Sequence, residues 1–432
     1  MEIPPANQNN SSPRLEPNVL IYGAIAVLLG TFILRVSGGM ATGTLNFYLK
    51  SLGQEGLEVG FVAAGYYATE LLLAPVFGAY SDRVGRKVII AAAPIIGAIA
   101  LLIYPLTSSI GVLFLIRILE GVSAAAAIPA TLGYLSDLTD GSPHRARIMG
   151  MYEIVTLLGV TGGGIVLGPL LWSWLGTSSY PLLAGVYVLG AVVFWLFLPN
   201  IGTRVQKRRN LSDYVRALSN QRLVRFLPAW LSATAVIGLW LVHVQNILSK
   251  GKDTPLSTGQ ALVGAFNPAE VSKYLGFFAA AFFFGLIFWA ERAKYGRRST
   301  PMLYAGGGLL AISVSWFFLN HPELGFNFFI PTPLEPISIW FLLLLVGAFF
   351  QAGFTPVALA YLADISGDFP EDRGVVMGLY SIFLAGGNLI GGSLLGGVFV
   401  SALKMDGVIL LTALFTLMAF VSVMNIRRAS SD

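Results

Sequence analysis

The sequence contains no cysteine and only three histidines among its 432 residues. Disulfide bonds and thiolate metal sites are therefore excluded, and too few imidazoles remain to favour a transition-metal centre. The chain lacks the Gly-x4-Gly-Lys-Ser/Thr order of a phosphate loop, which argues against ATP-driven transport. No nucleophile–base pair points to an enzyme. We expect no metal and no other cofactor.

Charged residues are scarce as well, at 11% of the chain, whereas soluble domains hold about 25%. Hydrophobic residues make up 55%, and apolar runs of about 20 residues, the length that crosses a bilayer core, recur along the chain. We therefore expect an all-α polytopic membrane protein. Twelve transmembrane helices are predicted, at 18–47, 57–81, 87–107, 110–137, 146–173, 180–199, 223–249, 271–292, 299–319, 336–363, 373–402 and 406–426.

The two halves of the chain resemble each other. Pro129-Ala-Thr-Leu-Gly-Tyr-Leu-Ser-Asp137 matches Pro356-Val-Ala-Leu-Ala-Tyr-Leu-Ala-Asp364, and Met149-Gly-Met-Tyr152 matches Met377-Gly-Leu-Tyr380. The offsets are nearly identical (356 − 129 = 227 and 377 − 149 = 228). A duplicated membrane unit is typical of a two-lobed transporter with its solute site between the lobes. We predict a disordered cytoplasmic tail (1–17), a six-helix bundle (18–200), a cytoplasmic linker (201–222) and a second six-helix bundle (223–428).

Lys and Arg residues predict the orientation, because they favour cytoplasmic loops. Of the 27, Arg35 and Arg117 fall inside spans and twenty fall in segments on the same side as both termini. The opposite side holds Lys50, Lys250, Lys252, Lys273 and Lys404. Both termini are therefore predicted to be cytoplasmic, in the cell or inner membrane. The basic residues are read as topology signals rather than as a nucleic-acid site.

The loop after the second span resembles the signature of the major facilitator superfamily. It reads Gly78-Ala-Tyr-Ser-Asp82-Arg83-Val-Gly85-Arg86-Lys87, and a degenerate copy with Ala293 in place of the acid follows the eighth span. Gly78 allows a close helix approach, and Asp82 is suited to the amino end of another helix. The resemblance implies that this helix is the eleventh, near Arg373, and that Gly78, Asp82, Arg83, Gly85 and Arg86 form a cytoplasmic gate. The alternative is a positively charged turn that only sets topology.

The fifth span carries Gly159, Gly162-Gly163-Gly164 and then Gly168-Pro169. Gly164, Gly168 and Pro169 resemble the Gly-x-x-x-Gly-Pro motif of proton antiporters in this superfamily, although Trp172 and Ser173 replace two expected glycines. Ordinary close packing of small residues is the alternative.

Ionisable residues within the spans are the sharpest local feature, because each costs about 2.5–3.5 kcal/mol or more at a helix centre unless paired or hydrated. Arg117 and Glu120 share one helix face at i, i+3. The full set lies in the first half, and we predict that it binds protons or substrate: Arg35, Glu70, Arg117, Glu120 and Glu153. Glu70 or Glu120 is the expected proton carrier, with Arg117 adjusting its pKa. The alternative is a static ion-pair network that stabilises the lobe.

The interior of the second half offers neutral polar residues and aromatics instead. We predict a substrate wall there, formed by Trp240, His243, Gln245, Asn246, Gln351 and Asn388.

These features predict a secondary active transporter that works by alternating access. The main hypothesis is proton-coupled export, by antiport, of small hydrophobic or amphiphilic molecules, by a monomer in the lipid bilayer. A proton symporter that imports a sugar, organic acid or other nutrient is the alternative, and a non-transporting receptor or scaffold is a third.

Overall fold

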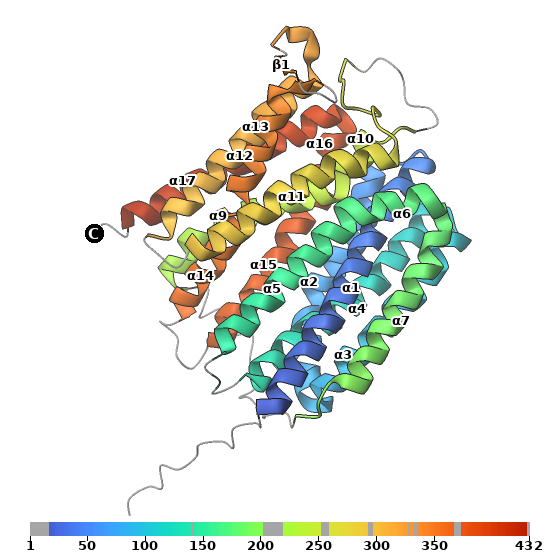
Figure 1. The fold of residues 1–432 in the computed structure, drawn as a ribbon, viewed down its shortest axis with the longest axis vertical. Helices are drawn as coiled ribbons and strands as arrows, with labels where there is room; N and C mark the ends of the chain where they lie inside the picture. The colour runs from blue at the N-terminus through green and yellow to red at the C-terminus, as the bar shows by residue number, and fades with distance from the viewer. Residues whose placement is uncertain are drawn as a thin grey trace, which may run out of the picture.

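The computed structural model describes residues 17–139, 142, 144–201, 219–251, 259–292, 297–326, 328–331, 336–366 and 373–429. Helices dominate these residues, and two bundles lie side by side (Figure 1). The predicted tail (1–17) and linker (201–222) fall almost entirely outside the described residues.

The first lobe contains helices joined by short turns. Its elements are α1 (Pro17–Ser51), α2 (Leu57–Val84), α3 (Arg86–Ile103), η1 (Tyr104–Leu106), α4 (Ile110–Leu138), α5 (Arg145–Thr161), η2 (Gly162–Leu167), α6 (Gly168–Leu175), η3 (Gly176–Ser178) and α7 (Ser179–Phe197). Within it, α2 packs on α4, α3 on α4 and α7, and α1 on α5 and α7.

The second lobe repeats this plan and adds a short hairpin. Its elements are α9 (Gln221–Leu239), η4 (Trp240–Val244), α10 (Gln245–Leu248), α11 (Pro268–Arg292), α12 (Ser299–Asn320), η5 (Pro322–Leu324), β1 (Phe329–Ile330), β2 (Ile337–Ser338), α13 (Ile339–Gln351), α14 (Phe354–Ser366), α15 (Arg373–Asn388), η6 (Leu389–Leu395), α16 (Gly396–Leu403) and α17 (Met405–Ala429). Strands β1 and β2 pair antiparallel, with Phe329 opposite Ser338.

Eleven stretches of the described residues are long and apolar enough to cross a membrane. One of them, Arg147–Phe197, has 51 residues, far more than the roughly 20 that a single crossing needs. It contains the turn at Gly176, where φ is +53°, and therefore accounts for two crossings. The described chain thus agrees with the twelve predicted spans, and the protein is an integral membrane protein.

Apolar side chains also cover the outer surface of the helices. Leu72, Trp195 and Leu417 are 59–69% exposed, which suits contact with lipid tails. Because lipid is as apolar as leucine, close helix packing rather than the hydrophobic effect holds such bundles together.

The internal repeat is visible in the backbone as well as in the sequence. Segments η2 and η6 are both π-helical and both follow the long first part of their helix. Their starts are separated by the offset that relates the sequence motifs (389 − 162 = 227). Segment η2 packs on α1, and η6 packs on α9, the corresponding helix of the second lobe.

Glycines allow the backbones of α1 and η2 to approach closely. A Cβ added to Gly163 would lie 2.3 Å from the carbonyl oxygen of Val36, and one on Gly43 would lie 2.3 Å from that of Gly164. A Cβ on Gly168 would lie 3.0 Å from the Cα of Gly43. Pro169 follows in the first turn of α6. These contacts give the glycine motif a packing role, and its antiporter role stays a prediction.

We expect Gly163→Ala to destabilise the protein by about 1–3 kcal/mol, because the new methyl group forces α1 and η2 apart. Gly162 is a matched control, since a Cβ there meets nothing within 4 Å. Thermal unfolding in detergent, followed by size-exclusion chromatography, measures the difference. Equal melting temperatures for Gly162→Ala and Gly163→Ala would contradict the packing argument.

Candidate functional site

Arg117 and Glu120 form a buried ion pair on α4. Their exposed fractions are 3% and 6%, and Arg117 Nη1 lies 2.8 Å from Glu120 Oε2. The hydroxyl of Tyr104, at the end of the preceding helix, donates to the same carboxylate oxygen at 2.7 Å. Arg117 also lies over the ring of Tyr66, with 4.4 Å from Cζ to the ring centroid. The i, i+3 spacing therefore brings the two charges together as predicted, and Tyr104 is a partner that the sequence pattern did not identify.

Glu70 on α2 lies in the electrostatic field of two arginines, Arg35 of α1 and Arg117 of α4. Arg35 interacts electrostatically with Tyr152 of α5 and with Glu70. Among the described residues, Glu70 has no ion-pair partner within 4 Å, unlike Glu120. Glu153 of α5 is half-buried and interacts with a neighbouring group. Glu120 is thus in direct contact with an arginine, whereas Glu70 interacts with two arginines without a close ion pair within the described chain.

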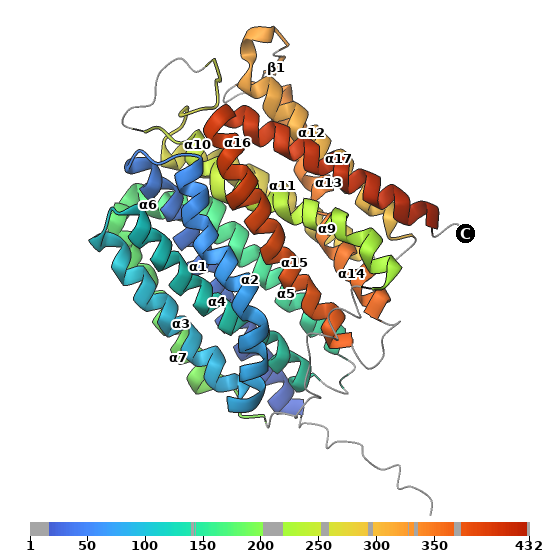
Figure 2. The ribbon, with the colours of Figure 1, turned by 180° about the vertical axis from the view of Figure 1, so that it is seen from behind.

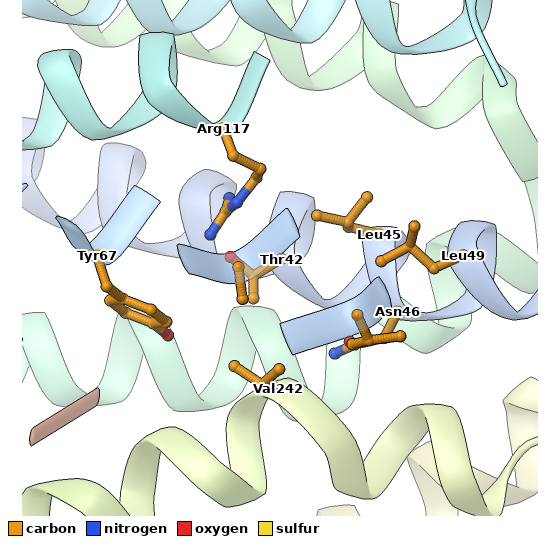
Figure 3. Close-up of a pocket in the computed structure, with 9 residues that line it drawn as sticks. Thr42, Leu45, Asn46, Leu49, Tyr67, Arg117 and Val242 are labelled. Carbon is orange, nitrogen blue, oxygen red and sulfur yellow. The ribbon is translucent and has the colours of Figure 1, made fainter. Parts of the chain in front are cut away.

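A small cavity adjoins Arg117 where the lobes meet, with room for about one water molecule. Helices α1, α2 and α4 of the first lobe and Val242 of the second contribute its walls. In Figure 3 the guanidinium of Arg117 points toward Thr42 and Tyr67, with Asn46 further along the cavity. The Nε of Arg117 is buried and has no hydrogen-bond partner in the described part of the chain. This N–H donor is therefore unused in the closed conformation.

The lobes are joined beyond this cavity, at the end predicted to be external. Asn46 donates to the carbonyl of Leu241 at 3.0 Å, and Asn246 donates to the carbonyls of Asn46 and Gln54 at 3.1 and 3.2 Å. Gln245 donates to the carbonyl of Gly164 at 2.8 Å. Phe47 of α1 is buried within a hydrophobic cluster formed largely by second-lobe residues. The molecule is therefore closed at its predicted external end.

A charged clamp completes this closure. Glu55, between α1 and α2, forms ion pairs with Lys50 of its own lobe and with Lys404 between α16 and α17. Lys50 is buried, and Lys404 has a φ of +54°, a backbone conformation that non-glycine residues rarely adopt. Burial alone would raise the pKa of Glu55, but hydrogen bonds and charges from Lys404 and Lys50 outweigh it and lower that pKa. The sequence pattern did not indicate this clamp, because Lys50 and Lys404 were interpreted only as lysines in loops on the predicted external side.

We expect Lys404→Glu to increase opening of the external side about fivefold, which corresponds to about 1 kcal/mol for a partly exposed pair. The measurement is the labelling rate of a cysteine introduced at Val242, with an impermeant thiol reagent added outside. Lys250→Glu is the control, because Lys250 is an exposed lysine on the predicted external side and lies outside the clamp. An unchanged labelling rate in Lys404→Glu would show that the clamp does not hold the lobes together.

The pH dependence of the clamp follows from the lowered pKa of Glu55. A carboxyl group with a lowered pKa contributes its stabilisation above its ordinary value and loses it as pH falls through the lowered one. The labelling rate should therefore be constant between roughly pH 6 and 8, and should rise only in strong acid.

The predicted cytoplasmic gate contains a second ion-pair cluster. Arg86, 5% exposed, lies 2.9 Å from Asp82 (Nη2 to Oδ1) and 3.2 Å from Asp137 (Nε to Oδ2). Its guanidinium lies against Gly133, where any added Cβ would collide with it. Gly85 forms the turn between α2 and α3 with a φ of +106°.

Other residues of the gate occupy less constrained positions. A Cβ on Gly78 would lie 3.4 Å from Pro129 of α4, and Arg83 is exposed. Helix α2 packs on α15, which begins at Arg373. The contacts of Asp82 described above lie within its own lobe, so its pairing with the amino end of α15 stays a prediction.

The second lobe repeats part of this arrangement. Arg298 Nε lies 3.0 Å from Asp364 Oδ2, and Asp364 follows Asp137 by the repeat offset (364 − 137 = 227). This pair is more exposed than its counterpart. The degenerate loop copy runs from Ala293 to Arg298, and its residues 293–296 lie outside the described residues.

The predicted substrate wall divides into residues with different contacts. Trp240 donates to Thr412 Oγ1 at 3.0 Å, and buried His243 contacts the carbonyl of Gly392 through Nε2 at 2.7 Å. Gln245 and Asn246 bind the first lobe, as described above. The side-chain oxygens of Gln351 and Asn388 are buried and have no hydrogen-bond partner in the described ranges. These last two residues therefore have unused acceptors, and the role of the whole set in binding a solute stays a prediction.

Comparison with known proteins agrees with this architecture. The family model for the Major Facilitator Superfamily matches residues 27–326 and 262–431. The chain belongs to the Major Facilitator Superfamily. It is therefore a transporter rather than an enzyme.

Within this superfamily, the chain is similar to two curated drug-resistance proteins. It is 21% identical to quinolone resistance protein NorA of Staphylococcus aureus (strain Mu50) over 376 residues, covering 83% of this chain and 85% of the relative. It is 23% identical to multidrug resistance protein 2 of Bacillus subtilis (strain 168) over 374 residues, covering 85% and 86%.

Two solved structures of the superfamily share the fold. The nucleoside transporter NupG has a TM-score of 0.70 at 14% identity and covers 94% of this chain and 98% of its own. A bacterial homologue of the human lysosomal transporter Spinster, inward-facing and occupied, has a TM-score of 0.69 at 14% identity and covers 96% and 98%. At these identities the likeness establishes the fold alone.

Proposed function

We propose that this transporter exports small hydrophobic or amphiphilic molecules in exchange for protons. The observation that carries the proposal is Glu70, a carboxylate within a membrane span that has no close ion-pair partner among the described residues and is influenced by Arg35 and Arg117. A carboxyl group in this setting is a candidate proton carrier, because its charged and neutral forms interact differently with the two arginines.

In this proposal the exchange follows from competition between proton and solute for one site around Glu70. With Glu70 charged, the first lobe offers a negative charge that a solute with cationic or polar character neutralises. With Glu70 protonated, that attraction is lost and the solute leaves. Alternating access then couples the two events, provided that the lobes rock only when the site is neutralised. The similarity to NorA and to multidrug resistance protein 2 supports drug-like solutes.

The geometry of the two ends supplies the gates for this cycle. In our proposal both termini are cytoplasmic, the Glu55 clamp closes the external side, and the Arg86 cluster belongs to the cytoplasmic gate. The two bundles, 18–200 and 223–428, move as units in a monomer. Gln351 and Asn388 present polar atoms to the solute from the second lobe.

A proteoliposome assay with an internal pH-sensitive dye tests the direction of coupling. The protein is reconstituted in known orientation, and a quinolone is added to one side. We expect proton movement opposite to the solute. Co-directional movement would contradict antiport, and a quinolone that evokes no proton movement in vesicles that transport it would exclude proton coupling.

Proton-coupled import of a nutrient is the second candidate, because the NupG structure shares the fold over nearly the whole chain. Uridine is the matched probe in the same vesicles. Uridine uptake with protons moving in the same direction would favour this candidate.

A further inference from the structure

The hairpin between α12 and α13 carries exposed aromatic side chains on the predicted external side. Phe326, Phe328 and Phe329 are 55%, 64% and 59% exposed. Exposed apolar patches of this kind mark surfaces that contact a membrane or another molecule. Figure 1 places the hairpin directly at the end of α13.

Specific contacts fix the base of the hairpin to the first turn of α13. The backbone N–H of Ile339 donates to the carbonyl of Phe328 at 2.9 Å, and the indole of Trp340 donates to the carbonyl of Phe326 at 2.7 Å. The Trp340 ring stacks on Phe318 of α12 with 4.2 Å between centroids. These contacts fix the backbone at Phe326 and Phe328, and the ring of Phe326 also packs on Phe318 with 5.6 Å between centroids.

An apolar groove connects the hairpin with the lipid-facing surface of the helix. It is lined by Phe328, Ile339, Trp340, Leu342, Leu343 and Val346. Val346, at the far end of this groove, is 51% exposed on α13. The surface that faces lipid tails therefore continues without interruption onto Phe328.

The length of the span sets the depth of the hairpin. Helices α13 (Ile339–Gln351) and α14 (Phe354–Ser366) together form this span, and its stretch Ile339–Leu362 has 24 residues, more than the roughly 20 that one crossing needs. The first residues of α13, beginning at Ile339, therefore lie near the boundary of the hydrocarbon core. Phe328, whose carbonyl accepts a hydrogen bond from Ile339, lies at the same level as Trp340, and tryptophan is enriched at this interface.

We propose that this hairpin is an interfacial anchor, with Phe326, Phe328 and Phe329 inserted at the boundary between headgroups and acyl chains of the outer leaflet. An acyl chain occupies the groove between Phe328 and Val346. The anchor fixes the depth of α12 and α13 while the lobes move, and it does not depend on which solute is transported.

Site-directed spin labelling tests the proposal, because the native chain has no cysteine to interfere. A nitroxide is attached to Phe328→Cys in the full-length protein in phosphatidylcholine–phosphatidylglycerol vesicles. Its collision rates with oxygen, which concentrates in the bilayer, and with a water-soluble nickel chelate are compared. Val346→Cys provides the lipid reference and Glu323→Cys, on an exposed side chain of the same loop, the aqueous one.

We expect the ratio of oxygen to nickel collision rates at Phe328→Cys to be at least fivefold above that at Glu323→Cys and close to that at Val346→Cys. A ratio equal to that at Glu323→Cys would overturn the proposal, because it places the hairpin in water. Low collision rates with both reagents would also overturn it, because they indicate burial against a protein partner. Phe329→Cys gives the same test if the first variant does not fold.

Discussion

Replacing Arg117 by Met is expected to destabilise the protein by about 3–5 kcal/mol, because it leaves the carboxylate of Glu120 buried without its cation. The remaining partner, the hydroxyl of Tyr104, donates one hydrogen bond to that carboxylate and does not neutralise it. The double variant Arg117→Met/Glu120→Met should recover most of this loss, since a buried ion pair and well-packed apolar residues are often equally stable. Denaturation in detergent measures both effects.

The same pair of variants separates a structural role from a transport role. If Arg117 and Glu120 serve coupling, the double variant is stable but transports at least tenfold more slowly than the native protein. If the pair is only a static network, the stable double variant transports at the native rate with the native proton dependence. Glu120→Gln is the companion variant, because it keeps a hydrogen-bonding group next to Tyr104 and removes the charge.

Glu70→Gln should abolish proton-driven transport, with a fall of at least tenfold in flux driven by a pH gradient. The amide is nearly the size of the carboxyl group but cannot exchange a proton, so solute binding and proton binding no longer compete. Solute exchange without a pH gradient should persist, because the lobes can still rock with solute bound. Glu58→Gln is the control, since Glu58 is an exposed carboxylate at the start of the same helix.

These measurements use proteoliposomes with and without an imposed pH gradient. Native coupling in Glu70→Gln would assign the proton to another group, with Glu120 and Glu153 next to be tested. Loss of exchange as well as of driven transport would instead give Glu70 a role in solute binding or folding.

The general architecture was predictable because it depends on local and repeated signals. Apolar length sets the spans, and the duplicated motifs around Pro129 and Pro356 indicate two lobes. The spacing of Arg117 and Glu120 also placed the two on one face, and the structure brings them into contact. Predicting that two side chains share one helix face requires only the geometry of the helix.

The contacts between elements were not predictable in the same way. Tyr104 reaches Glu120 only because α3 ends beside α4, and Glu55 meets Lys404 only because the lobes are closed at one end. Gln245 and Asn246 were expected to face solute, but in this conformation both bind the opposite lobe. The same sequence adopts every conformation of a transport cycle. A sequence pattern therefore does not predict which partner a side chain contacts in a particular conformation.

The paired π-helical turns η2 and η6 give each lobe the same point of bending. A π turn holds its hydrogen bonds less well than an α turn, so the helix yields there more readily than elsewhere. Because the two turns lie at equivalent positions of the repeat, each lobe can bend at the same place when the lobes move. The second lobe has a further π turn, η4, whereas α1 is one continuous α-helix, so the second lobe has one more point at which it can bend.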